Sequence, residues 1–161
     1  MRRIAVAAFL VIAQACAPKA APLQGSLSPS VTLPKIALAP GHRRLVFRWD
    51  YEENSLIAKG EGAIRVASPD SARVDLFLEG GIALGKAVLI GDKLRATNQE
   101  RVERVLPPPP MMWAALGRLA VPPLPDTVVT TEGDVIRADI GRPAAWRVTI
   151  RGTRLMQLAR L

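Results

Sequence analysis

The chain has 161 residues, of which 49% are apolar, 22% charged and only 4% aromatic, and its net charge is +8. This length suits one domain with a hydrophobic core, so we expect no second domain. One cysteine excludes an intramolecular disulfide framework, and one cysteine with one histidine gives too few ligands for a zinc site. The 14 prolines exclude a mainly helical protein unless they cluster, which they do. We expect no metal and no cofactor.

The N-terminus reads as an export signal. Arg2 and Arg3 precede an uncharged apolar run over residues 4–13, and Ala13-Gln14-Ala15 places small residues at the spacing that a signal peptidase accepts. Ten residues rise about 15 Å as a helix, roughly half the hydrocarbon thickness of a bilayer. The sequence therefore predicts a signal peptide over residues 1–15, and no other stretch is apolar for long enough to predict a transmembrane helix.

The only cysteine, Cys16, follows that cleavage site directly. This arrangement resembles the lipobox of bacterial lipoproteins, in which the cysteine is diacylated and becomes the mature N-terminus. Ala15 and Cys16 match the pattern, whereas Ala13 stands where the family usually has leucine, so ordinary secretion is the alternative. The resemblance implies lipidation of Cys16, and two or three acyl chains anchor a protein stably. No acidic retention signal follows Cys16, which favours an outer-membrane lipoprotein facing the periplasm over inner-membrane anchoring.

Residues 16–42 are rich in alanine, serine and proline and indicate an extended tether that reaches roughly 30 Å. Within the tether, residues 31–38 are apolar enough to pack on the following domain as a short strand.

From Arg43 onward apolar and polar residues alternate with a period close to two, which is typical of strands. Gly60 and Gly62 lie inside one such strand and predict sharp curvature or the close approach of another backbone. The credible helix spans residues 111–121 and is ended by Pro122-Pro123. The predicted strands are residues 43–51, 56–67, 73–78, 84–90, 93–98, 101–106, 127–132, 135–140 and 145–151, and residues 155–161 are a last strand or a frayed helical end.

Eight or nine short strands and one helix predict a mainly β domain over residues 43–161, built as a curled antiparallel sheet, an incomplete half-barrel. Some strands, such as residues 84–90, are apolar on both faces and need cover on both. The concave face either closes over the plugging helix or remains an apolar pocket.

Residues 62–66, the turn Ser68-Pro69-Asp70-Ser71 and the hairpin at Gly91-Asp92 resemble, in this order, the LolA/LolB-like lipoprotein-carrier family of bacterial envelopes. Residues 112–119 resemble the helix that plugs its half-barrel. The resemblance covers about residues 43–150 and implies that the concave face binds the acyl chains of lipoproteins. The family usually continues through further strands where this chain stops at Leu161, which leaves an exposed edge.

The resemblance also implies site residues. Ile82 or Leu84 would form the protruding loop that inserts cargo into the membrane, although a glycine-rich loop can also tuck its apolar residues inward. The alternative for the cavity residues is that they are ordinary core. The residues expected to bind lipid are Leu45, Phe47, Trp49, Ile64, Leu76, Val88, Met112 and Leu116.

Little in the sequence indicates catalysis. His42 is the only histidine, and the six serines lie in tether or turn contexts without a nucleophile elbow. No phosphate-binding glycine loop opens a helix. Export and scattered bases with few aromatics disfavour nucleic acid, whereas attraction to an anionic membrane surface fits the positive charge.

We therefore expect a monomeric, non-catalytic envelope lipoprotein that binds acyl chains or lipidated proteins, held at the membrane by acylated Cys16. The alternative is an anchored interaction module that docks another envelope protein through its sheet edge.

Overall fold

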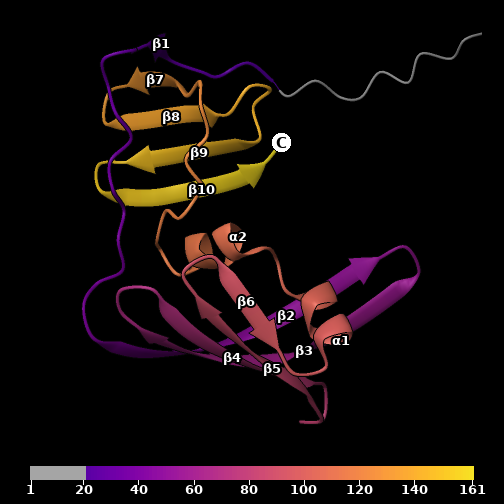
Figure 1. Cartoon of the computed structure of the whole chain (residues 1–161). Coiled ribbons are helices and arrows are strands. Elements are labelled where there is room, and N and C mark those ends of the chain that lie inside the picture. The colour runs from indigo at the N-terminus through magenta and orange to yellow at the C-terminus, as the bar shows by residue number, and fades with distance from the viewer. Residues whose placement is uncertain (1–20) are drawn as a thin grey trace, which may run out of the picture.

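The computed structural model describes residues 21–161, so the predicted signal peptide and Cys16 lie outside the described residues (Figure 1). The described chain is mainly β, as expected, but its strands form two antiparallel sheets of five rather than one curled sheet of eight or nine. The N-sheet consists, in spatial order, of β2 (His42–Glu53), β3 (Leu56–Ala67), β4 (Ser71–Leu78), β5 (Ala83–Ile90) and β6 (Lys93–Ala96). The C-sheet consists of β1 (Ser26–Leu27), β7 (Val128–Glu132), β8 (Val135–Ile140), β9 (Trp146–Arg151) and β10 (Arg154–Arg160).

The break between the sheets comes from the segment that joins β6 to β7. The prediction of a strand over residues 101–106 is wrong: after Asn98 takes a left-handed conformation (φ 55°), the chain forms α1 (Gln99–Val105). Helix α1 packs on β5 and β6, where Val102 is fully buried. A run of four prolines follows, and proline cannot donate to a sheet. The chain therefore cannot continue the N-sheet and crosses to build a second one.

The predicted helix over residues 111–121 is present but shorter and begins earlier, as α2 (Pro109–Ala115). Proline suits the first positions of a helix, because N–H groups there have no partner within the helix and proline has none. Its ring also fixes φ near the helical value. Gly117 takes a left-handed φ of 89° just beyond the C-terminus, which ends the helix. In residues 21–161, neither helix is long and apolar enough to cross a bilayer.

Helix α2 lies between the two sheets (Figure 1). Its Met112 and Trp113 are buried in the cluster under the N-sheet, with Val74, Leu76 and Leu89. Met111 and Ala114, on the other side of the helix, pack against the cluster under the C-sheet, which is built from Val129, Ala138, Ile140, Val148 and Ile150. One short helix therefore contributes to both cores.

Much of the expected tether belongs to the folded unit. Strand β1 pairs with β7, and Ile36 and Leu38 are buried in the C-sheet and N-sheet clusters respectively. The N–H of Leu119 donates to the carbonyl of Ile36 over 3.0 Å. Residues 31–38 thus pack on the domain, as anticipated, but without forming a strand. The apolar side chains of Val31, Leu33, Ile36 and Leu38 pack against the two clusters, which explains why this segment is held on the domain.

The paired glycines of β3 lie under aromatic rings. In the β2–β3 register Gly60 is opposite Trp49 and Gly62 is opposite Phe47. A Cβ at Gly62 would collide with the Phe47 ring, and one at Gly60 would collide with the backbone carbonyl of Phe77. The expected close approach of another backbone is therefore confirmed at Gly60. Glycine at both positions lets the rings cover the strand.

We predict that Gly60→Ala lowers the free energy of unfolding by about 2–3 kcal/mol, because a backbone carbonyl cannot move aside as a side chain can. Gly62→Ala should cost less, about 1–2 kcal/mol, since only the Phe47 ring must shift. Urea denaturation of both variants measures the difference. In a Phe47→Leu background the cost of Gly62→Ala should shrink and that of Gly60→Ala should not; equal relief of both costs would contradict the geometry.

A second prediction concerns the ion pair between β8 and β9. Arg147 binds both carboxylate oxygens of Asp139, at 2.7 Å and 2.8 Å, and this hydrogen bonding is the main cause that raises the pKa of the guanidinium. The two side chains are only 23% and 19% exposed. We expect Asp139→Asn to destabilise the protein by about 1–2 kcal/mol, as for hydrogen bonds to charged groups that are shielded from water.

The matched control is Glu61→Gln. Glu61 pairs with Arg48 at 3.8 Å, and these side chains are 67% and 90% exposed. Such exposed pairs contribute little, so a loss below about 0.5 kcal/mol is expected by the same denaturation measurement. A Glu61→Gln effect as large as that of Asp139→Asn would show that burial is not what distinguishes the two pairs.

Candidate functional site

The structure separates the predicted lipid-binding residues into two groups. Six of them, Phe47, Trp49, Ile64, Leu76, Met112 and Leu116, belong to or pack against the cluster between the N-sheet and the helices. Leu45 is 44% exposed at one side of β2. Val88 does not join the others, because it is paired with Arg73 on the outer face of the sheet, whereas Ala87 and Leu89 are the buried residues of β5.

The inner face of the N-sheet is closed by the two helices. Leu76 and Met112 are only 1% and 5% exposed, and Trp113 is fully buried beside them. Of the two expectations for the concave face, closure over helices describes these residues better than an open pocket. Their role as lipid ligands stays a prediction.

The predicted insertion loop is represented by one residue. Ile82 is 64% exposed in the β4–β5 turn, whereas Leu84 packs against the N-sheet cluster and does not protrude. A second apolar tip was not foreseen: β2 and β3 extend past β4 as a hairpin, and Leu56 and Ile57 are exposed at its end (Figure 1). Two apolar residues directly after the turn at Asn54-Ser55 were the available signal.

The strongest candidate for a ligand site is a groove of about 540 Å³ beside α2, which we call the α2 groove. Trp113 is held in it from two sides. Its indole Nε1 donates to the carbonyl of Gly91 over 2.6 Å, and the guanidinium of Arg118 stacks on the ring, 4.7 Å from its centre. The groove is lined by Gly91, Asp92, Pro109, Pro110, Trp113, Arg118, Ala120, Val121, Pro122 and Pro123.

Arg118 gives this largely apolar groove a cationic group. One of its terminal nitrogens, Nη1, is buried without a hydrogen-bond partner among the described residues. An unpaired buried donor is costly, and stacking on Trp113 offsets only part of that cost. Asp92 also lines the groove, and it forms no ion pair among the described residues. Mostly apolar walls with a guanidinium stacked on Trp113 suit an amphiphile whose chain is buried and whose acidic head pairs with Arg118.

The sequence alone does not predict the α2 groove. The helix prediction placed Arg118 inside a continuous helix, whereas the early end of α2 turns the chain back at Gly117, and the N–H of Arg118 then bonds to the carbonyl of Trp113. The useful signal was the pair of proline clusters on either side of a tryptophan-containing helix.

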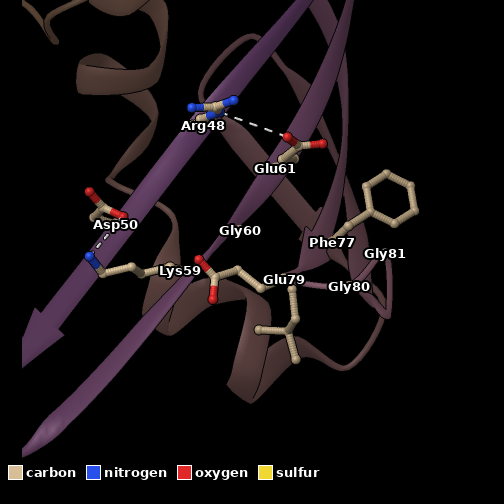
Figure 2. A pocket seen from close by; sticks show the side chains of 10 residues that line it. Arg48, Asp50, Lys59, Gly60, Glu61, Phe77, Glu79, Gly80 and Gly81 are labelled. Atoms are coloured by element: carbon tan, nitrogen blue, oxygen red, sulfur yellow. Dashed lines mark ion pairs between the residues drawn. The ribbon is translucent and has the colours of Figure 1, made fainter.

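A second groove, of about 450 Å³, opens on the outer face of the N-sheet near the β4–β5 turn. Glu79 lines this groove and forms no ion pair among the described residues. The other four charged side chains are paired, Arg48 with Glu61 at 3.8 Å and Lys59 with Asp50 at 4.0 Å (Figure 2). Exposed pairs of this kind leave little net field for a charged ligand. No group of three or more metal-ligating side chains occurs among residues 21–161.

His42 lines a third groove, of about 470 Å³, together with Ser71 and four arginines. His42 and Ser71 are paired with the same residue, Ala67, from opposite sides, so they stand two strand spacings apart, roughly 9–10 Å. No carboxylate is among the lining residues. The hydrogen-bonded contact between serine, histidine and acid that nucleophilic catalysis requires is not assembled there.

No protein-family model, no curated protein and no solved structure matches this chain. The likeness to the LolA/LolB-like family, together with the cargo and the membrane that it implies, therefore stays a prediction from the sequence.

Proposed function

We propose that this protein is a non-catalytic lipid-binding lipoprotein of a bacterial envelope, and that it holds the apolar chain of an acidic amphiphile in the α2 groove. The observation that carries the proposal is the combination of apolar groove walls with the Arg118 guanidinium stacked on Trp113. The volume of about 540 Å³ lies within the range of small-molecule sites.

The proposal moves the ligand from the concave face of the N-sheet to the groove beside α2. The apolar side chains of Leu76 and Met112 are already packed against other residues of the protein. An acyl chain bound among them would therefore have to displace the helix. In the α2 groove the prolines at 109, 110, 122 and 123 present apolar surface without needing to move.

The ligand class follows from the forces available. Apolar burial is non-directional and scales with area, so chains of different length should bind with graded affinity. The single guanidinium favours a carboxylate or phosphate head over a neutral one. The envelope location and the anchor rest on residues 2–16 and are carried by the sequence alone.

A bulky side chain placed in the groove tests the proposal. The chain with Cys16→Ser, which prevents acylation, is produced with its export signal, and its bound lipids are measured by native mass spectrometry and organic extraction. We expect fatty acid or phospholipid on this protein and at least tenfold less on Ala120→Phe, whose ring would fill the groove. Ala39→Phe, at an exposed position outside the groove, should keep the ligand.

Arg118→Met tests whether the guanidinium recognises the acidic head independently of the apolar chain. We expect this variant to keep apolar ligands and to lose most of its preference for acidic over neutral amphiphiles, measured by competition between a fatty acid and its methyl ester. A protein that is well folded by circular dichroism and carries no lipid would contradict the proposal. Equal lipid loss from Ala120→Phe and Ala39→Phe would contradict the choice of groove.

A second candidate function is docking of an envelope protein by strand addition. Strand β2 is a twelve-residue edge of the N-sheet, and a long unpaired edge is a template for another strand. Charged side chains along β2 oppose pairing of this edge with arbitrary strands. The partner strand would therefore carry complementary charges. A lipid-free protein in the extraction experiment would favour this function over the first.

A further inference from the structure

The outer face of the N-sheet carries a row of arginines that crosses the sheet. Arg44 of β2 is directly opposite Arg65 of β3, and Arg65 is directly opposite Arg73 of β4. The row continues through Val88 of β5, which pairs with Arg95 of β6. Residues directly opposite one another on paired strands point to the same face, so four guanidinium groups share one line across five strands. We call these four residues the arginine row.

The arginine row is under-neutralised. Like charges directly opposite each other destabilise a sheet, and their cost is normally offset by acids between them. Here only Arg73 has an acidic partner, Asp75 at 2.9 Å; among residues 21–161, Arg44, Arg65 and Arg95 form no ion pair. Lys86 and Lys93 lie in the adjacent positions of the same face, so six cations share this area with one carboxylate.

Exposed aliphatic side chains stand among these cations. Val46 is 70% exposed, Ile90 57% and Val88 39%, all on the outer face. Phe77 is the one Phe, Trp or Tyr on this face of the described N-sheet, and it lines the groove near the β4–β5 turn, away from the arginine row. The described residues beside the arginine row therefore include no aromatic ring on which the bases of a single-stranded nucleic acid could stack. Cations interleaved with aliphatic groups suit the interface of an anionic bilayer.

We propose that the outer face of the N-sheet docks on the surface of an anionic phospholipid bilayer, with the arginine row against the phosphate groups. The groove of about 470 Å³ that Arg44, Arg65 and Arg73 line is large enough to receive one headgroup. Among residues 21–161 the helices cover only the opposite side of the sheet, so this part of the chain leaves the outer face open (Figure 1). This docking is independent of a ligand in the α2 groove, because it uses other residues on the other face.

A fluorophore on the outer face gives a site-specific test. Cys16 is the only cysteine, so Cys16→Ser gives a cysteine-free chain into which Val46→Cys or, on β10 of the C-sheet, Met156→Cys is introduced. Each is labelled with an environment-sensitive dye and titrated with vesicles of phosphatidylglycerol and phosphatidylcholine or of phosphatidylcholine alone. We expect a blue shift for the dye at position 46 with the anionic vesicles only, a loss of that shift in 1 M salt, and no shift at position 156.

Charge variants identify the residues. Arg65→Glu with Arg95→Glu should weaken binding to the anionic vesicles about thirtyfold or more, since each well-placed base near a membrane adds roughly fivefold. Arg154→Glu with Arg160→Glu changes the net charge equally on exposed residues of the C-sheet and should leave binding within about threefold. Circular dichroism and urea denaturation of both double variants verify folding.

Three results would overturn the proposal. The first is equal dye shifts at positions 46 and 156, which would place the contact elsewhere. The second is equal weakening by the two double variants, which would reduce the effect to net charge. The third is a dye shift at position 46 with an oligonucleotide at lower charge concentration than with phosphatidylglycerol, which would assign the face to a soluble polyanion.

Discussion

The packing of Trp113 between a hydrogen bond and a stacked cation is the interaction on which the rest of the structure depends. The indole is fully buried, bonds to the turn between β5 and β6 through Gly91, and carries Arg118 on its face. These contacts fix α2 against the N-sheet, and the opposite side of the same helix supplies Met111 and Ala114 to the C-sheet core. Without α2 neither sheet would have a complete cover for its apolar face.

The same helix explains how the N-sheet divides its chemistry between two faces. The inner face is closed by α1 and α2 and by aromatic rings lying over Gly60 and Gly62, so it serves stability. The two proposed lipid sites lie in places that the core leaves open: the α2 groove with Arg118, and the outer face with the arginine row. Both places join cationic groups to apolar surface, so the two proposals share one class of ligand, acidic lipid.

The strand periodicity and turn residues were enough to predict most strands, and the hairpin at Gly91-Asp92 and the whole of β3 and β8 match within their ends. The second sheet could not be foreseen, because it arises when Asn98 and the prolines divert the chain, which alternation does not encode. The arginine row depends on strand register. Direct opposition of Arg44 and Arg65 follows from the two-residue turn at Asn54-Ser55. The predicted strands 43–51 and 56–67 leave a four-residue turn, which would keep both arginines on one face but place Arg44 opposite Ala63.

Native-state hydrogen exchange of backbone amides in increasing urea tests the central claim, that α2 joins the two sheets into one cooperative unit. Val74 of β4 and Val148 of β9 are both fully buried, one in each core. If α2 couples the cores, the amides of these residues should open with the same free energy and the same dependence on urea, as one global unfolding event. Separate free energies and slopes, with the C-sheet opening while the N-sheet stays protected, would contradict the account.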